Sequence, residues 1–353
     1  MLIKPRYSPR DLLRWTRLEI GLFSIYALTV TALYELAGLR FLHLPWAPVA
    51  VVGTAVAFIV GFQNNAAYGR IWEARKIWGG IVNASRAWAM RIQDFVTAEH
   101  ATEEVSEEEL AEHRRTLVHR HLAWLTALRH AMRQPRPWET FDAHKTNREW
   151  SREANIPERI FSLEDELLPT LPADDWDKVM ASTNKPAAIL FAQSAHVRAL
   201  KERGLIWGFS FLQLENALET LFELQGKSER IKNFPYPRQY ATLSYEFVRL
   251  FLVFIPFAAI PEFARIGHQL VENGSPIGPW FVWLAAPFSL VMSWIFYVME
   301  RIGRVGEIPF EGSANDVPIS TMARGIEIDL REMLGEDPEH LPKPLPATFD
   351  VQM

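Results

Sequence analysis

The sequence contains no cysteine, which excludes disulfide bridges, thiolate catalysis and zinc sites built on cysteine. It also lacks a glycine-rich loop that could hold phosphates and the nucleophile elbow of a hydrolase. Histidines gather between positions 113 and 130, but no two of them are three or four residues apart, so one helix face presents no chelating pair. They are His113, His119, His121 and His130. These absences argue against an enzyme.

A strong basic character is missing as well. The formal net charge is −5, and no segment gathers lysine and arginine in the way that phosphate backbones require. We therefore expect no nucleic-acid partner.

Long apolar runs are present at both ends of the chain, whereas 97–245 is charged. About 20 apolar residues are needed to cross roughly 30 Å of hydrocarbon, and four runs approach this length. They are 20–34, 46–62, 247–260 and 279–299. The last run carries no charge, whereas Pro256 interrupts the third. The pattern predicts four transmembrane helices.

Lysine and arginine counts set the expected orientation, because short cytoplasmic flanks are enriched in both. The tail before the first run carries several of them, and Arg70, Arg75 and Lys76 follow the second run. Both termini are therefore predicted to be cytoplasmic. The expected parts are a basic interfacial segment 1–19, transmembrane helices 1 and 2 at 20–63, a cytoplasmic helical domain 64–245, transmembrane helices 3 and 4 at 246–299, and a cytoplasmic segment 300–353.

The second run continues as a helix beyond the membrane, because no proline stops it. Thr54, Phe58 and Phe62 fall at i, i+4 and i+8 and share one face. A single helix over 46–95 would be about 75 Å long at 1.5 Å per residue. Taken alone, this aromatic stripe is more typical of core packing than of a pore.

The charged middle reads as helical in part. Ser106 and Glu109 form a capping box before a helix that reaches about 132. Further helices are expected over 186–204 and 209–224, whereas 135–186 is expected to be irregular apart from a short helix near 160–168. The 209–224 helix aligns Glu215, Glu219 and Glu223. This row is either a solvated face or an acidic lining of a cytoplasmic vestibule that would favour cations.

After the fourth run, the sequence predicts a turn-rich segment at 308–318 and a C-terminal tail. Glu311 and Asp316 supply oxygen atoms that could serve a calcium ion, although two carboxylates are a weak signal. The proline-rich tail after Gly335 is expected to be extended or disordered.

Three motifs resemble the bestrophin family of ion channels in its bacterial branch. They are NNAAYGRIWEARKIW at 64–78, IKNFPYPRQY at 231–240 and PFEGSANDVP at 309–318. The resemblance implies an all-α subunit with four transmembrane helices and a helical cytoplasmic domain, assembled as a homopentamer around one axial pore. It further implies a narrow neck at Thr54, Phe58 and Phe62, and a cytoplasmic constriction for which Ile189 is the candidate. Calcium binding, known from eukaryotic members, is implied only weakly because few acids are kept.

The predicted function is passive conduction of small ions across a bacterial inner membrane, with anions such as chloride favoured and the hydrophobic neck as gate. Polar residues at the inner mouth support anions; they are Gln63, Asn64, Asn65 and Arg70. The acidic row would instead support a cation channel selective for sodium or potassium. Alternatives without conduction are a membrane-anchored sensor or enzyme and a structural scaffold. The expected partners are further copies of the chain, the lipid bilayer and small inorganic ions.

Overall fold

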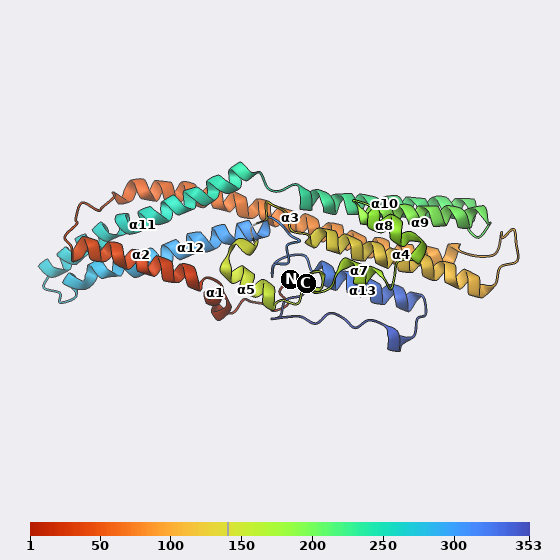
Figure 1. The fold of residues 1–353 in the computed structure, drawn as a ribbon. Coiled ribbons are helices and arrows are strands. Elements are labelled where there is room, and N and C mark those ends of the chain that lie inside the picture. The colour runs from red at the N-terminus through yellow and green to blue at the C-terminus, as the bar shows by residue number, and fades with distance from the viewer. Residues whose placement is uncertain (140) are drawn as a thin grey trace.

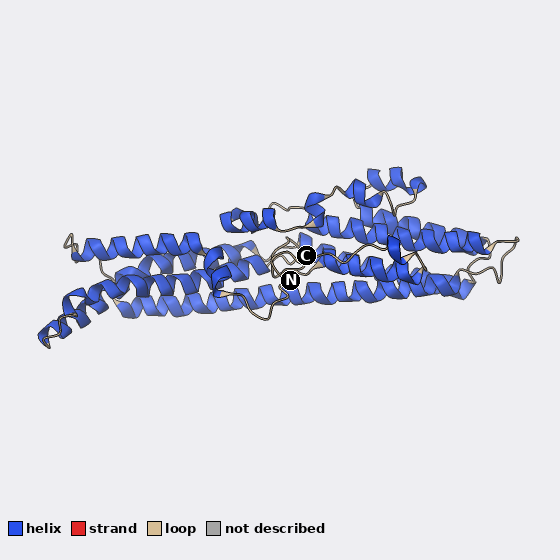
Figure 2. Cartoon of the chain, turned by 90° about the horizontal axis from the view of Figure 1, so that it is seen from below, coloured by secondary structure: helices blue, strands red, loops and turns tan. Residues whose placement is uncertain are grey.

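The computed structural model describes residues 1–139 and 141–353, and within them the regular elements are helices, with no strand (Figure 2). The molecule is elongated, with a membrane-grade helix bundle at one end and a second bundle at the other (Figure 1). The chain termini lie together near the middle. There, Leu2 and Val351 form an antiparallel bridge.

Four helices of the described chain are long and apolar enough to cross a membrane. They belong to α2 (Arg17–Glu35), α3 (Trp46–Phe95), α11 (Arg238–Glu272) and the joined η2 (Gly278–Leu284) and α12 (Ala285–Gly306), preceded by the short α1 (Pro9–Trp15). The prediction of four such helices is confirmed.

Helix α3 joins the two bundles as one unbroken element over the predicted range 46–95. In the membrane bundle it packs against α11 and α12, and further along, in the second bundle, against α4, α10 and α13. Trp78, Ile81 and Trp88 are fully buried in the large core of the second bundle. These residues recur at helical spacing, so they form the face of α3 that packs in this bundle.

The expected interruption at Pro256 does not occur, and α11 runs through both Pro256 and Pro261. A proline inside a helix leaves one carbonyl without its donor, which a neighbouring helix or loop can replace. The Phe257 carbonyl, whose helical donor would come from position 261, accepts a hydrogen bond from the Leu44 N–H at 2.9 Å. The Tyr26 hydroxyl also donates to the Val253 carbonyl at 2.9 Å and joins α2 to α11 near Pro256. At Pro261, packing thus supplies a donor that the local sequence does not.

The second bundle contains more helix than the sequence indicated. Its elements are α4 (Glu107–Arg133), η1 (Phe141–Ala143), α5 (Lys145–Glu153), α6 (Pro157–Ile160), α7 (Leu163–Leu167), α8 (Ala173–Ala181), α9 (Lys185–Glu202), α10 (Gly208–Asn233), α13 (Ile319–Met333) and η3 (Pro338–His340). The Ser106 side chain accepts from the Glu109 N–H at 3.2 Å, as the capping box predicts.

Two expectations for this bundle are wrong. The range 135–186 is largely built from short helices, and α10 continues past Gly226 because Gln225, Ser228 and Ile231 extend its buried face. Helix α13 was not expected at all.

Candidate pore face and the junction behind it

The predicted neck residues lie on the outer face of α3, away from the rest of the subunit. Phe58 and Phe62 are 65% and 71% exposed, and Thr54 is exposed as well. The opposite face buries Val56 and Val60 against the membrane bundle. Large aromatic side chains left uncovered in a membrane helix point to a face that meets a pore, a neighbouring subunit or lipid.

Two of the polar residues predicted for the inner mouth point into the subunit instead. Gln63 is 2% exposed, and its Nε2 donates to Glu307 Oε1 at 3.0 Å. The Asn64 Nδ2 donates to the Met299 carbonyl at 3.0 Å. Of this group only Asn65 lies on the exposed face of α3. The cause is helical geometry, because residues one or two positions after Phe62 are turned by about 100° and 200° from it.

Arg70, the fourth of these residues, holds the helix junction together. Its guanidinium donates to the carbonyls of Glu307 at 2.6 Å, Ile231 at 2.8 Å and Phe234 at 2.9 Å. These acceptors lie in or beside the two other motifs, at 231–240 and 309–318. The structure therefore brings the three motifs together at one place, about two helical turns beyond Phe62 along α3.

Close contact between α3 and α12 depends on two glycines that the sequence reading did not single out. A Cβ atom at Gly303 would lie 2.8 Å from the Asn64 Oδ1, and one at Gly306 would lie 3.3 Å from the Ala67 Cβ. Glu307 follows directly. Small residues at a helix–helix interface let two backbones approach closely in a membrane, so these two glycines on one side of α12 are a signal that could have marked this contact.

The candidate for the cytoplasmic constriction does not line a path in the subunit. Ile189 is fully buried in the core of the second bundle, where α9 packs on α4. The uncovered apolar side chain of this helix is Phe191, which is 76% exposed. The face of α9 that carries Phe191 is the one available to a pore or to another subunit.

Of the three aligned glutamates on α10, one has a neutral hydrogen-bond donor and one has an exposed lysine as its partner. Glu215 accepts from the Ser194 hydroxyl at 3.0 Å, and Glu223 pairs with Lys227 at 2.9 Å. Glu219 and Glu223 are exposed. Their carboxylates therefore remain available to solvent or to ions.

The two acids considered for calcium are buried. Asp316 accepts hydrogen bonds from the backbone N–H groups of Gly312 at 2.7 Å and Ser313 at 2.9 Å, so it closes its own turn. Within residues 1–139 and 141–353, no three histidine, aspartate or glutamate side chains come close enough to share a metal ion. Calcium binding by Glu311 and Asp316 therefore stays a prediction, and we assign no ion to these two residues.

Glu311 provides a test of this segment through pH. Burial, with Asp316 and Glu139 nearby, raises the pKa of Glu311 well above its usual range, and its Oε1 atom has no hydrogen-bond partner in the described chain. The folded protein therefore holds a proton that the unfolded chain releases, so this group lowers stability as pH rises above about 4.5.

We expect Glu311→Gln to raise the thermal midpoint at pH 8 by about 2–4 °C and to flatten its fall between pH 5 and 8. Melting of the full chain in detergent, followed by tryptophan fluorescence, would measure both effects. The same substitution at the exposed Glu332 is the control. A Glu311→Gln protein with the wild-type pH slope would show that this carboxyl is ionised in the fold.

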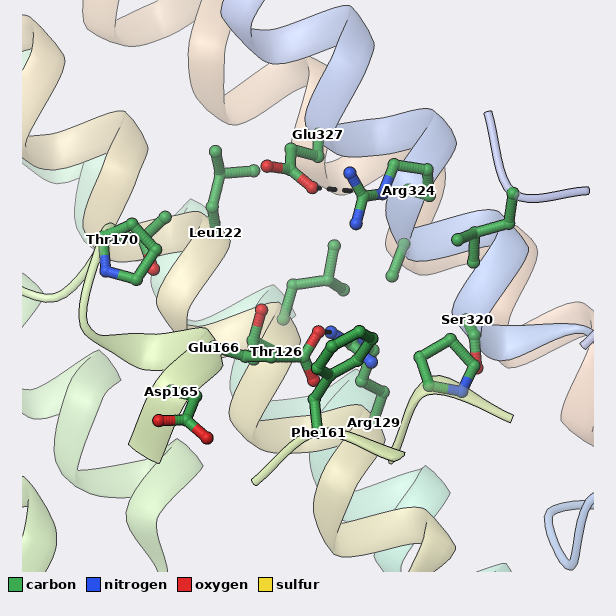
Figure 3. A pocket seen from close by; sticks show the side chains of 15 residues that line it. Leu122, Thr126, Arg129, Phe161, Asp165, Glu166, Thr170, Ser320, Arg324 and Glu327 are labelled. Carbon is green, nitrogen blue, oxygen red and sulfur yellow. Dashed lines mark hydrogen bonds and ion pairs between the residues drawn. The ribbon is translucent and has the colours of Figure 1, made fainter. Parts of the chain in front are cut away.

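A separate cavity of about 290 Å³ lies in the second bundle between α4, α7 and α13. Figure 3 shows Arg324 directed toward Glu327, and Arg129 beside Glu166. Because its charged side chains already pair with one another, the cavity does not identify a ligand.

Comparison with known proteins agrees with this geometry. The family model described as bacterial and fungal bestrophin protein matches residues 15–332. A voltage-dependent anion channel-forming protein of Ralstonia nicotianae is 27% identical over 351 residues, which cover 95% of each chain. A protein of the same description from Escherichia coli K12 is 26% identical over 316 residues, covering 89% of this chain and 84% of its own.

Solved structures show the same fold. A crystal structure of a bacterial bestrophin homolog from Klebsiella pneumoniae matches with a TM-score of 0.69 at 24% identity, covering 93% of this chain and 100% of that one. The chain is thus a membrane protein and not an enzyme. With a family model that spans nearly its whole length and a fold to match, this chain belongs to the bestrophin family, in its bacterial and fungal branch.

Proposed function

We propose that this protein is a passive ion channel, a homopentamer around one axial pore, that favours anions such as chloride. The observation that carries the proposal is the outward face of α3, where Thr54, Phe58 and Phe62 are uncovered in the single subunit. Five symmetric copies would surround the axis with two phenylalanine rings. Such apolar constrictions gate by excluding water.

The junction behind this face holds the neck in register. Gln63, Asn64 and Arg70 attach α3 to α12 and to the segment before α11 through hydrogen bonds to Glu307, Met299 and Ile231. The role of these three residues in our proposal is therefore support of the neck, and the polar lining of the inner mouth falls to Asn65. In the cytoplasmic domain the exposed Phe191 replaces Ile189 as the candidate constriction.

We place the protein in the bacterial inner membrane with both termini in the cytoplasm. The pairing of Leu2 with Val351 puts the two ends of the chain on one side, beside the cytoplasmic bundle. Arg70, Arg75 and Lys76 follow the second span on this same side, as short cytoplasmic flanks require.

Anion preference is supported by the names of the curated relatives, which describe anion channel-forming proteins. A cation channel of the same architecture is the second candidate, because Glu219 and Glu223 are exposed on α10 and could face the ion path. The two candidates predict opposite reversal potentials.

Reversal potentials measured on the purified full chain in planar bilayers, under a tenfold sodium chloride gradient, test the proposal. We expect a current that reverses close to the equilibrium potential of chloride. Reversal near the sodium potential would favour the cation channel. Pentamers that carry neither ion would overturn the proposed function and favour a sensor or a scaffold.

A further inference from the structure

The face of α3 that carries the neck continues well below the membrane. Phe58 and Lys76 are eighteen residues apart, which is five turns at 3.6 residues per turn, so both side chains leave the helix in the same direction. The positions between them on this face are Phe62, Asn65, Gly69 and Trp72, and all four are exposed, as is Lys76. Between positions 58 and 76, Lys76 is the charged residue whose side chain leaves α3 on the same face as Phe58 and Phe62.

Lys76 is also free to act on a passing ion. It has no ion-pair partner in the described part of the chain, whereas neighbouring charges are engaged. Glu73 pairs with Arg230 of α10, and Arg75, turned by about 100° from Lys76, contacts Met1. Because no carboxylate of the described chain neutralises it, the ammonium group of Lys76 can attract anions and repel cations beside this helix face.

A lysine at this place could instead contact lipid headgroups, but its height argues against that. Lys76 lies about 21 Å beyond Phe62 along the helix at 1.5 Å per residue, whereas the headgroup layer is only about 5–8 Å deep. At the height of Lys76, the opposite face of α3 buries Ile77 and Trp78 in the cytoplasmic core. Lys76 therefore sits in the cytoplasmic bundle.

We propose that Lys76 is a selectivity-determining residue, five copies of which form a ring of positive charge around the ion path on the cytoplasmic side of the neck. This inference rests on the proposed pentameric channel, and it assigns the source of anion preference to one side chain. The ring would concentrate anions and repel cations before they reach the phenylalanine rings.

The size of the effect follows from screened Coulomb attraction. Five unit charges about 10 Å from the axis, in water at 0.15 M salt, change the chloride-to-sodium permeability ratio by about five- to tenfold. We expect Lys76→Gln to lower the ratio by this factor, and the loss to grow as the salt concentration is reduced. A purely structural lysine would not produce this salt dependence.

Arg75→Gln is the matched control, because it removes an equal charge at nearly the same height but from another face of α3. We expect it to leave the ratio unchanged. The absence of cysteine from the chain allows a second test with Lys76→Cys and no background substitutions. Modification with 2-aminoethyl methanethiosulfonate should restore the ratio toward wild type, and the sulfonatoethyl reagent should lower it further.

The outcomes separate this inference from the proposed function. Channels that conduct but keep the wild-type ratio in Lys76→Gln, and in both modified forms of Lys76→Cys, would overturn the role of Lys76 alone. An equal change in Arg75→Gln would also overturn it, because facing the path would then not matter. A wild-type protein that carries no current would overturn the channel itself.

Discussion

Phe58→Ala is expected to raise chloride flux through the reconstituted protein by at least about tenfold. In the proposed pentamer this substitution removes five phenyl rings from the narrowest part of the path, so water and ions enter a region that they otherwise avoid. A tenfold change requires only about 1.4 kcal/mol off the barrier, which is modest for the removal of a complete apolar ring. Chloride efflux from liposomes, normalised to the amount of intact pentamer, measures it.

Phe247→Ala on α11 is the matched control, because Phe247 is also an exposed phenylalanine on a membrane-spanning helix. We expect it to leave flux unchanged. Phe62→Ala should act like Phe58→Ala, since both side chains occupy the same uncovered face. Wild-type flux from intact Phe58→Ala pentamers would remove Phe58 from the gate.

The long helix α3 could be predicted to the residue because its signals are local. Proline stands only at its start, and one periodicity passes from apolar to amphipathic without a break. The full length of α11 could not be predicted in this way. It contains two internal prolines, and the donor that replaces the N–H missing at Pro261 is the N–H of Leu44, which bonds to the Phe257 carbonyl from more than 200 residues away in sequence.

In the candidate site, too, some features follow from local sequence and others depend on distant partners. The exposed face of Thr54, Phe58 and Phe62 follows from spacing along one helix. The direction of Gln63 does not, because its partner Glu307 lies 244 residues away. Polar residues at the end of a transmembrane run predict a pore mouth. In the structure, two of them, Gln63 and Asn64, instead form hydrogen bonds that join α3 to α12 and the residue after it.

The assignment of Ile189 failed for a related reason. A helix turns by about 100° per residue, so an alignment that slips by one or two positions exchanges a core residue for an exposed one. Ile189 and Phe191, two positions apart, differ in just this way. A residue that acts by facing the pore axis can be identified only when the packing of its helix in the surrounding bundle is known.

Glu158→Ala is expected to lower the free energy of unfolding of the second bundle, the one that contains α4 and α13, by about 3–5 kcal/mol, the usual cost of breaking a buried ion pair. The Glu158 side chain has no solvent exposure, pairs with Arg129 and Arg133, and accepts from the Ser320 hydroxyl at 2.7 Å. Its loss leaves two buried guanidinium groups short of a counter-charge. Urea unfolding of the full chain, followed by tryptophan fluorescence, would measure the change.

The pH dependence identifies the charge as the cause. Burial alone would raise the pKa of Glu158, but Arg133 and Arg129 hold this pKa at about 2. The folded carboxylate thus resists protonation, and its contribution is complete above about pH 4.5 and is lost as pH falls toward 2. Glu158→Gln should lack this part of the acid transition, while Glu164→Ala, at an exposed glutamate of α7, should keep it. If Glu158→Ala unfolds at the wild-type urea concentration, the two arginines find other partners and the bundle does not depend on this pair.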